Sequence, residues 1–541
     1  MCAMALQFTI PEQSGAYADD VRVSDTERWF ANLPLLNAAE TSHNLFNALT
    51  ALNRRPVESE SRLKVLELYR RPILQVCDEH QKRYIGQPLP LSQDGKLVAE
   101  RVRQFQVEMA YGYKHVVLGW GQADKRGSPD RSELALAIQR AIRYLTEVLA
   151  KSYELYAPSP EGTWREIHQL YRYAEIEGIT EVPIRDELNS AVAQSTVSHV
   201  YKQALLLDFS DPYHLPARLL QKISRYLDAY APLAQLTLAI AALRPDCQFL
   251  INLVNDRAGV ANIENPPITT EAQYRLLTTV ELARVMHQQL SALQGGHLPP
   301  EDALGKDFYA NRGQEMLMRL ITSWGVNPKR YFPRTTKRGM KIEVISGIDT
   351  INCWANGGSV FVLSTKEVGP QPMRTQISSI ARHDSSQSCD QAPGEAWDLV
   401  DESAGGFSLE KTDAKDERVQ VGDLIATRTL GQASGWGIAV VRWARSSGPD
   451  NLEMGVQRLA PGAEPTAVLP SDAPASDFKM ALRLPEIKPL RQPETLITPR
   501  GMFKLHRILL LDNGYRTYQI RVTKLINVTG SFEQFQFVFV N

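Results

Sequence analysis

The chain has 541 residues, enough for roughly three or four domains of ordinary size. Hydrophobic residues make up 43% and charged residues 22%, which is typical of globular proteins and excludes a disordered or fibrous chain. Lys and Arg number 60 and Asp and Glu 61, giving a net charge of −1. This balance argues against a surface built to hold a nucleic acid polymer or an anionic membrane.

The cysteines and the termini show no sign of export or metal binding. The five cysteines lie far apart and form no C-x-x-C pair, so we expect neither a disulfide framework nor a zinc site. The N-terminus lacks the basic and apolar segments of an export signal. The longest apolar stretch, near Ala231 to Leu243, is about 13 residues long, whereas a membrane span needs roughly 18 to 20. We expect a cytoplasmic protein without a membrane insertion or a cofactor.

The first part of the chain, from about Trp29 to Trp324, has apolar residues at helical spacing. Thr163-Trp164-Arg165-Glu166 has the form of a capping box and predicts the start of one helix. Another helix is predicted from Thr270 through Leu276 to Met286. The pattern predicts an all-helical bundle or superhelix, divided into a tail (1–28), a helical domain (29–157) and a second helical domain (158–327).

After Pro328 the pattern changes to short β-rich runs between turn residues. The runs cover residues 341–345, 359–363, 423–427, 437–443 and 452–457. They predict an antiparallel β-barrel over residues 328–460, with an exposed loop inserted near 369–395. The chain is therefore expected to be a multidomain α + β protein.

The last part of the chain is predicted to be a linker and a small β unit. Residues 461–477 are rich in Pro, Ala and Ser and predict the linker, and 478–541 form the β unit. Asp512-Asn513-Gly514 is a hairpin turn signal. Phe535, Phe537 and Phe539 alternate, which predicts that one face of the last strand is buried.

A basic cluster stands where the two halves meet. Residues 329–341 contain no acidic residue and hold six cations: Lys329, Arg330, Arg334, Lys337, Arg338 and Lys341. Pro333 disfavours a helix, and in an extended chain positions i and i+4 face one side about 13 Å apart. Two guanidiniums at that separation suit two phosphates, or a phosphate and a guanine edge. The alternative is a solvated basic linker, since the pair Arg334 and Arg338 has the same spacing.

A second cluster lies at residues 397–407, which resemble a strand running into a glycine turn. Asp401 and Ser403 are two positions apart and so point to one face of a strand. A carboxylate accepts hydrogen bonds from the guanine N1–H and amino groups, and a hydroxyl can donate to a phosphate or a ring nitrogen. Gly406 ends the pattern and allows a close approach of the backbone. Taken alone, these residues are also ordinary turn formers.

Together the clusters resemble the PilZ domain family, bacterial receptors for cyclic di-GMP. The family signature is R-x-x-x-R ahead of a six-stranded barrel, followed by (D/N)-x-S-x-x-G on an early strand. Arg330 and Arg334 match the first motif, and Tyr-Phe-Pro between them favours this pair over the overlapping one. Asp401, Ser403 and Gly406 match the second motif. The motifs are 67 positions apart, more than in the compact family pattern, and we assign the excess to the loop near 369–395.

The resemblance implies roles for these residues. Arg330 and Arg334 would clamp a guanine and a phosphate of cyclic di-GMP, and Lys329 would add a secondary basic contact. Asp401 and Ser403 would hold the other side of the ligand, and Gly406 would set the turn. In this family, ligand binding orders the arginine loop and shifts the barrel against its neighbouring domain.

The sequence has no P-loop, no G-x-S-x-G elbow and no H-E-x-x-H motif, so we do not expect an enzyme. The leading hypothesis is a receptor that passes cyclic di-GMP binding from the barrel to the helical half and to an unidentified protein partner. One alternative is an interaction scaffold whose PilZ-like barrel has lost the ligand. Another is an enzyme in the helical half that the barrel regulates.

Overall fold

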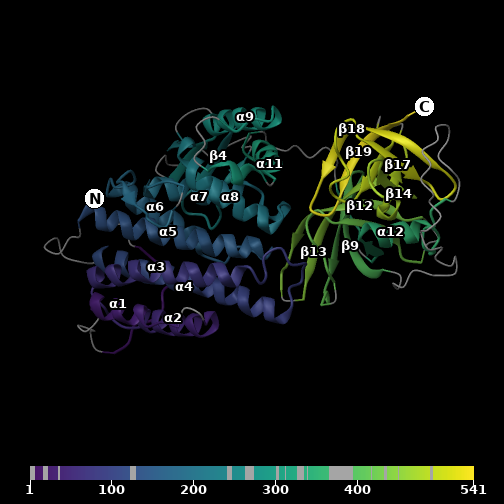
Figure 1. Cartoon of the computed structure of the whole chain (residues 1–541). Helices are drawn as coiled ribbons and strands as arrows, with labels where there is room; N and C mark the ends of the chain where they lie inside the picture. Colours follow the sequence, from purple (N-terminus) through teal and green to yellow (C-terminus); the bar gives the residue numbers. More distant parts are fainter. Residues whose placement is uncertain are drawn as a thin grey trace. The chain divides into compact units, whose positions relative to one another are not determined.

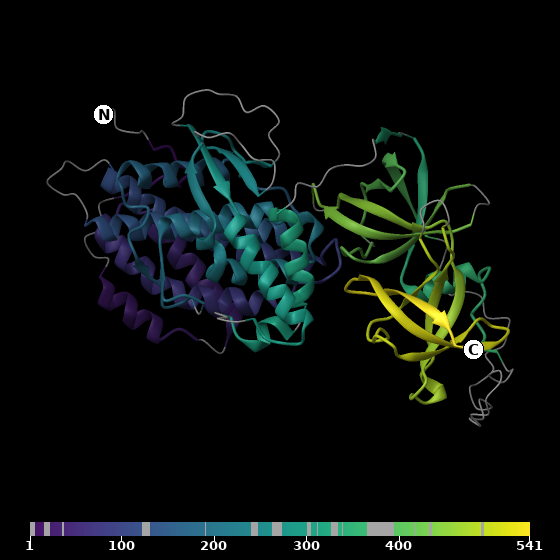
Figure 2. The same cartoon turned by 90° about the horizontal axis from the view of Figure 1, so that it is seen from above.

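The structure is a computed structural model with two compact units (Figures 1 and 2). It describes residues 6–15, 22–34, 37–121, 130–189, 191–239, 247–261, 273–299, 304–310, 312–325, 334–337, 339–364, 394–415, 417–431, 435–448, 450–487 and 492–540. The first unit, here the helical unit, comprises Met1–Gln87 and Leu91–Lys329. The second, here the barrel unit, comprises Pro88–Pro90 and Arg330–Asn541.

The helical unit is built mainly of α-helices. Its described helices are α1 (Val23–Ala31), α2 (Ala38–Asn53), α3 (Ser59–Gln81), α4 (Gln93–Gly121), α5 (Arg131–Glu154), α6 (Thr163–Ile176), α7 (Val197–Phe209), η2 (Pro212–His214), α8 (Ala217–Tyr230), η3 (Ala231–Leu233), α9 (Val280–Gln294), α10 (Lys306–Ala310) and α11 (Gly313–Gly325). The long helices α3, α4 and α5 lie side by side (Figure 1). Ile138, Ile142 and Leu145 of α5 recur at helical spacing and are buried, which explains why this helix lies inside the unit.

The predicted helical region is confirmed, but the helical unit also contains short strands and so is not all-helical. The strands are β1 (Ile184–Arg185), β2 (Gln194–Ser195), β3 (Gln235–Leu238), β4 (Gln248–Asn252), β5 (Val260–Ala261) and β6 (Tyr274–Thr278). Strands β3 to β6 form an antiparallel sheet in the order β3-β6-β4-β5. The helix predicted from Thr270 is wrong over Tyr274–Thr278, because Leu276 and Leu277 are buried in the central strand β6 and pair with β4. A short apolar run fits either structure, and here pairing with β4 selects the strand.

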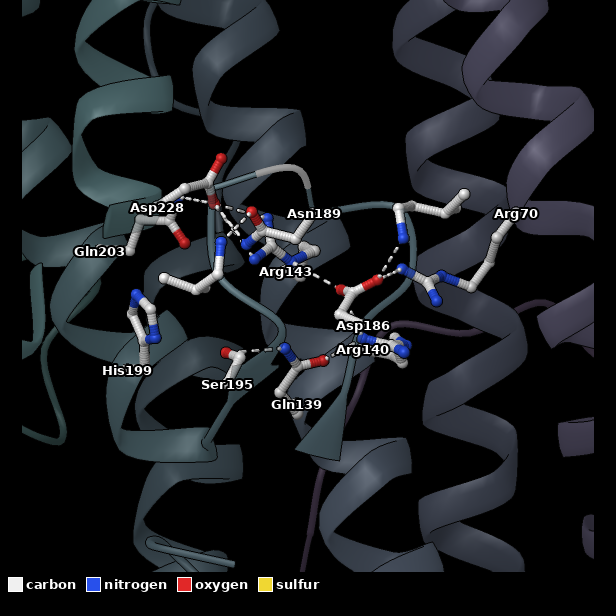
Figure 3. Close-up of polar contacts among 12 residues, drawn as sticks. Arg70, Gln139, Arg140, Arg143, Asp186, Asn189, Ser195, His199, Gln203 and Asp228 are labelled. Carbon is white, nitrogen blue, oxygen red and sulfur yellow. Dashed lines mark hydrogen bonds and ion pairs between the residues drawn. The ribbon is translucent and has the colours of Figure 1, made fainter. Parts of the chain in front are cut away.

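Buried ion pairs fix the loop between α6 and α7 to the long helices (Figure 3). Asp186, only 2% exposed, accepts hydrogen bonds from Arg70 of α3 (2.7 Å) and Arg140 of α5 (2.8 Å). Arg143 of α5 donates to Asp228 of α8 (3.2 Å). These charges pair with one another across α3, α5 and α8, so the network has a structural role.

The barrel unit contains two β-barrels. Its elements are β7 (Thr335–Thr336), β8 (Lys341–Ser346), α12 (Ile348–Ala355), β9 (Glu395–Ser403), β10 (Gly406–Lys411), β11 (Leu424–Thr429), β12 (Gly437–Arg445), β13 (Leu452–Ala460), β14 (Glu464–Pro470), η5 (Ala475–Asp477), β15 (Lys479–Leu484), β16 (Thr495–Thr498), β17 (Ile508–Asp512), β18 (Thr517–Val528) and β19 (Glu533–Phe539). The helical region followed by an antiparallel barrel confirms the predicted fold class.

The first barrel consists of β8 to β13. Its strand order is β10-β13-β12-β11-β8-β9, and pairing of β9 with β10 closes it. The two-residue strand β7 adds to the edge of β9. Residues 88–90 also belong to this unit, and Leu89 exchanges backbone hydrogen bonds of 2.9 and 3.0 Å with Val419.

The second barrel consists of β14 to β19 and corrects the predicted C-terminal region. These six strands form a closed barrel in the order β14-β15-β16-β19-β18-β17, larger than the small β unit expected. The predicted linker over 461–477 contains β14, because Ala467, Val468 and Leu469 are buried within the barrel despite the linker-like composition. Phe539, at the end of β19, is 45% exposed, so the alternation of the last phenylalanines does not extend to it.

The two barrels share a hydrophobic core. Ile351 of α12, Ile438 of β12 and Phe532 before β19 belong to one buried cluster. The side chain of Asn352 donates to the carbonyl oxygens of Thr466 (2.9 Å) and Ala481 (2.8 Å) in the second barrel. Helix α12 therefore joins the barrels.

The predicted run over 359–363 is not a strand. The next residue, Ser364, instead hydrogen-bonds Asp512 at the end of β17 through its backbone N–H (3.1 Å) and hydroxyl (2.8 Å). This segment thus contacts the second barrel, where a buried carboxylate satisfies its polar groups.

Candidate functional site

The D-x-S-x-x-G motif occupies the β-hairpin formed by β9 and β10. Asp401 and Ser403 lie on β9, Gly406 begins β10, and Ser403 pairs directly with Gly406. Only Ala404 and Gly405 stand between the two strands, so the turn is tight. The predicted strand and glycine turn are confirmed.

Arg334 of the first motif lies against Asp401 of the second. Arg334 Nη1 is 3.1 Å from Oδ1 and 3.0 Å from Oδ2 of Asp401. The pairing of β7 with β9 explains this position, because Thr336 lies opposite Asp401 in the ladder. The side chains of Arg334 and Asp401 are 38% and 23% exposed, so a ligand in solution can reach both.

Ser403 and Gly406 shape the turn. The hydroxyl of Ser403 donates to the carbonyl oxygen of Gly406 (3.1 Å), so its hydrogen is used within the turn and its oxygen can act as an acceptor. A Cβ atom at Gly406 would lie 2.0 Å from the carbonyl oxygen of Val456 on β13. Glycine is therefore required at this position by the close approach of β13.

Three residues that are not among the predicted site residues also meet at the turn. Glu402 forms ion pairs with Lys337 (2.6 Å) and Arg458 of β13 (2.5 Å). Lys337 belongs to the basic cluster in the sequence, and Glu402 stands between Asp401 and Ser403 of the second motif. The sequence therefore offered a reason to assign both residues to the site. Arg458 is an isolated cation near the end of a strand, and no sequence pattern points to it.

The electrostatics of this region are mixed. Hydrogen bonds from Lys337 and Arg458 hold the pKa of Glu402 below its usual value. Burial raises the pKa of Glu453 on β13, and the neighbouring carboxylates Glu410 and Asp401 add to this effect. The cations at the turn thus favour the charged form of Glu402, whereas burial disfavours the charged form of Glu453.

The remaining predicted site residues, Lys329 and Arg330, lie outside the described residues, as does most of the loop predicted near 369–395. Among the residues that the structure does describe, no three His, Cys, Asp or Glu side chains gather as metal ligands would. No helix in that same part of the chain is long and apolar enough to cross a membrane.

Comparison with known proteins gives matches along the chain. Family models match three stretches: the N-terminal domain of the cyclic-di-GMP receptor FimW (residues 24–242), its middle PilZ domain (363–465) and its C-terminal beta-barrel domain (466–540). Lys329, Arg330 and Arg334 fall between the first two matched ranges. The cyclic-di-GMP receptor FimW of Pseudomonas aeruginosa is 27% identical over 587 aligned positions, covering 99% of this chain and 93% of that protein. No solved structure matches the chain significantly.

These matches agree with the architecture. The range of the C-terminal model begins inside β14, as expected if this strand belongs to the second barrel. The PilZ model covers β9 to β13, and the resemblance to PilZ domains in the sequence is confirmed. The order of a helical region, a PilZ barrel and a second barrel shows that the chain belongs to the FimW family of cyclic-di-GMP receptors.

Proposed function

We propose that this chain binds cyclic di-GMP at the first barrel, through Arg330, Arg334, Asp401, Ser403 and Gly406, with Lys329 as a secondary contact. The observation that carries this proposal is the contact of Arg334 with Asp401, which joins the two motifs at one turn. Membership of a family of cyclic-di-GMP receptors supports the identity of the ligand.

The chemistry of the two side chains suits a guanine dinucleotide. A guanidinium carries five N–H donors, and the contact with Asp401 uses Nη1. Donors on the same group can bind phosphate oxygens in a bidentate manner or the O6 and N7 atoms of guanine. The carboxylate of Asp401 can accept from the Watson–Crick edge of guanine. The site needs no reacting group, and we propose a receptor without catalytic activity.

We propose in addition that binding is relayed to the helical residues 29–327 and from there to a protein partner. In the sequence, Arg330 and Arg334 stand on the segment that links α11 with β7. A ligand that grips these arginines would restrict the segment that connects the two units. Such a relay requires two conformations of the protein that bind cyclic di-GMP with different affinities. The free energy that the relay can transmit is limited by that difference in affinity.

Isothermal titration of the purified chain with cyclic di-GMP tests the binding proposal. We expect saturable binding to the wild type, none to Arg334→Ala and none of GTP to either protein. Equal affinity in wild type and variant would overturn the site. No binding to the wild type would overturn the function and favour the scaffold alternative.

Hydrogen exchange tests the relay separately. With saturating cyclic di-GMP, we expect slower exchange in peptides of the helical unit of the wild type and no change in Arg334→Ala. Protection confined to the barrel unit would contradict the relay while leaving binding in place.

A further inference from the structure

Glu402, the residue between Asp401 and Ser403, joins two cations from different parts of the barrel unit. Its Oε2 atom is 2.6 Å from Lys337 Nζ, and its Oε1 atom is 2.5 Å from Arg458 Nη2. The three side chains are partly exposed, at 27%, 43% and 42%. Glu402 and the two cations, here the Glu402 cluster, have no role in the two motifs.

Arg458 forms hydrogen bonds with the turn that carries the second motif. Its Nη1 atom donates to the carbonyl oxygen of Ser403 (2.8 Å), and its backbone N–H donates to Gly405 (3.1 Å). The guanidinium also lies 4.9 Å from the ring centre of Phe407, within cation–π distance. Arg458 thus contacts both ends of the turn, with its side chain at Ser403 and Phe407 and with its backbone at Gly405.

Lys337 holds the segment that carries the first motif. Its backbone N–H donates to the carbonyl oxygen of Val400 (3.1 Å), next to the pairing of Thr336 with Asp401. Arg334 directly precedes this two-residue strand. The position of Arg334 opposite Asp401 therefore depends on a short ladder, and the ion pair of Lys337 with Glu402 reinforces it.

The cluster is better explained by positioning than by stability. Ion pairs between partly exposed side chains contribute little to folding stability. These bonds, however, converge on a single turn and on the segment opposite it. A binding site gains affinity when its side chains are held in the bound geometry before the ligand arrives.

We propose that Glu402, with Arg458 and Lys337, positions Arg334 opposite Asp401 and so preorganises the cyclic di-GMP site. This inference rests on the proposed function. Glu402 and Arg458 act through the turn and the arginine segment, so they are positioning residues and need not touch the ligand.

Titration of the full chain with cyclic di-GMP tests the inference in Glu402→Gln, Arg458→Ala and Arg458→Lys. Glu402→Gln and Arg458→Ala each remove charge-assisted hydrogen bonds of the Glu402 cluster. We therefore expect each substitution to weaken cyclic di-GMP binding about tenfold or more. Lysine retains the charge beside Glu402 but cannot form the same fork, so Arg458→Lys is expected to be intermediate. Glu410→Gln, on the exposed part of β10, is the matched control and should bind as the wild type does.

The double variant separates positioning from independent effects. Since either single variant already loses the ion pair of Glu402 with Arg458, the variant carrying both Glu402→Gln and Arg458→Ala should lose less affinity than the sum of the two single losses. Melting temperatures should stay close to that of the wild type. Should Arg458→Ala unfold early, Glu402→Gln and Arg458→Lys decide the question.

The outcomes distinguish this inference from the function on which it rests. Wild-type affinity in Glu402→Gln and Arg458→Ala, with binding by the wild type, would overturn only the positioning role. Fully additive losses in the double variant would also overturn it. Failure of the wild type to bind cyclic di-GMP would overturn the proposed function and this inference together.

Discussion

Arg334 and Asp401 stand 67 positions apart in the sequence, yet Arg334 Nη1 lies 3.0 and 3.1 Å from the two carboxylate oxygens. The described part of the chain between them includes β8, α12 and the segment at 359–364, and these elements belong to the barrel unit. The long separation therefore does not keep the motifs apart. The contact depends on β7, which lies beside β9 and sets Arg334 at the turn.

Gly406→Ala is expected to damage both the fold and the site. The added Cβ would lie 2.0 Å from the carbonyl oxygen of Val456, so β10 and β13 would have to separate. We expect a loss of about 2 kcal/mol or more in the free energy of unfolding, measured by urea denaturation. Gly435→Ala is the control, because nothing lies within 4 Å of a Cβ there. Equal stability of the two variants would show that the strands do not approach as described.

Phe532→Ala is expected to destabilise both barrels together. The ring is fully buried in the core that α12, β12 and the second barrel share. Truncation should cost about 3–5 kcal/mol, and hydrogen exchange should accelerate in β12 as well as in β16. Phe539→Ala is the matched control, since that side chain is 45% exposed. Faster exchange in the second barrel alone would show that the barrels are energetically independent.

Asp186→Ala is expected to be strongly destabilising in the helical unit (Figure 3). The change removes one of the two carboxylates that the buried Arg70 and Arg140 share, and leaves Glu67 as the remaining one. Removing one partner of a buried ion pair costs about 3–5 kcal/mol, and because Glu67 remains beside both arginines we expect the lower end of this range. The measurement is the urea denaturation midpoint. The control is Glu60→Ala, which removes the exposed partner of Lys64 and should change the midpoint little. A small effect of Asp186→Ala would contradict the structural role of the network.

His168 is expected to make the helical unit sensitive to acid. Its Nδ1 lies 2.7 Å from the Tyr201 hydroxyl and its Nε2 lies 2.9 Å from the Arg257 carbonyl oxygen, and burial lowers its pKa to about 4. In the unfolded chain His168 binds a proton near pH 6.5. The contribution of neutral, buried His168 to the free energy of unfolding is therefore fully present above pH 6.5 and is lost as the pH falls toward 4. By pH 5 the loss should reach about 2 kcal/mol.

A variant that cannot titrate isolates this effect from that of other histidines. His168→Gln can donate to Arg257 and accept from Tyr201, so its stability should fall less between pH 7 and pH 5. The measurement is the difference between the two proteins in urea midpoint across that range. Parallel pH profiles would contradict the assigned pKa of His168.

Local patterns in the sequence predicted the first barrel and its turn well. The runs at 341–345, 437–443 and 452–457 fall within β8, β12 and β13, and the second motif falls on the predicted strand and turn. These features depend on alternation and turn residues within a few positions, which is the information that a sequence carries directly.

Features that depend on distant residues were missed. Gly162, and not Thr163, is the N-cap of α6, and Asp256 accepts from the backbone N–H groups of Gly162 (2.5 Å) and Arg165 (3.1 Å). Glu166, the predicted capping partner, binds Lys114 instead (2.6 Å). Strand β6 and Arg458 were missed for the same reason, because their roles come from partners far away in the chain.

The most direct test of the site is a titration of the overlapping arginine pairs with cyclic di-GMP. The wild type, Arg330→Ala, Arg334→Ala and Arg338→Ala are compared by isothermal titration, with melting temperatures as a check on folding. Because Arg334 and Asp401 form a partly exposed pair, the loss of Arg334 should change stability by about 1 kcal/mol or less. We predict that Arg330→Ala and Arg334→Ala abolish binding and that Arg338→Ala binds as the wild type does. Binding that survives in Arg334→Ala, or is lost only in Arg338→Ala, would contradict the account.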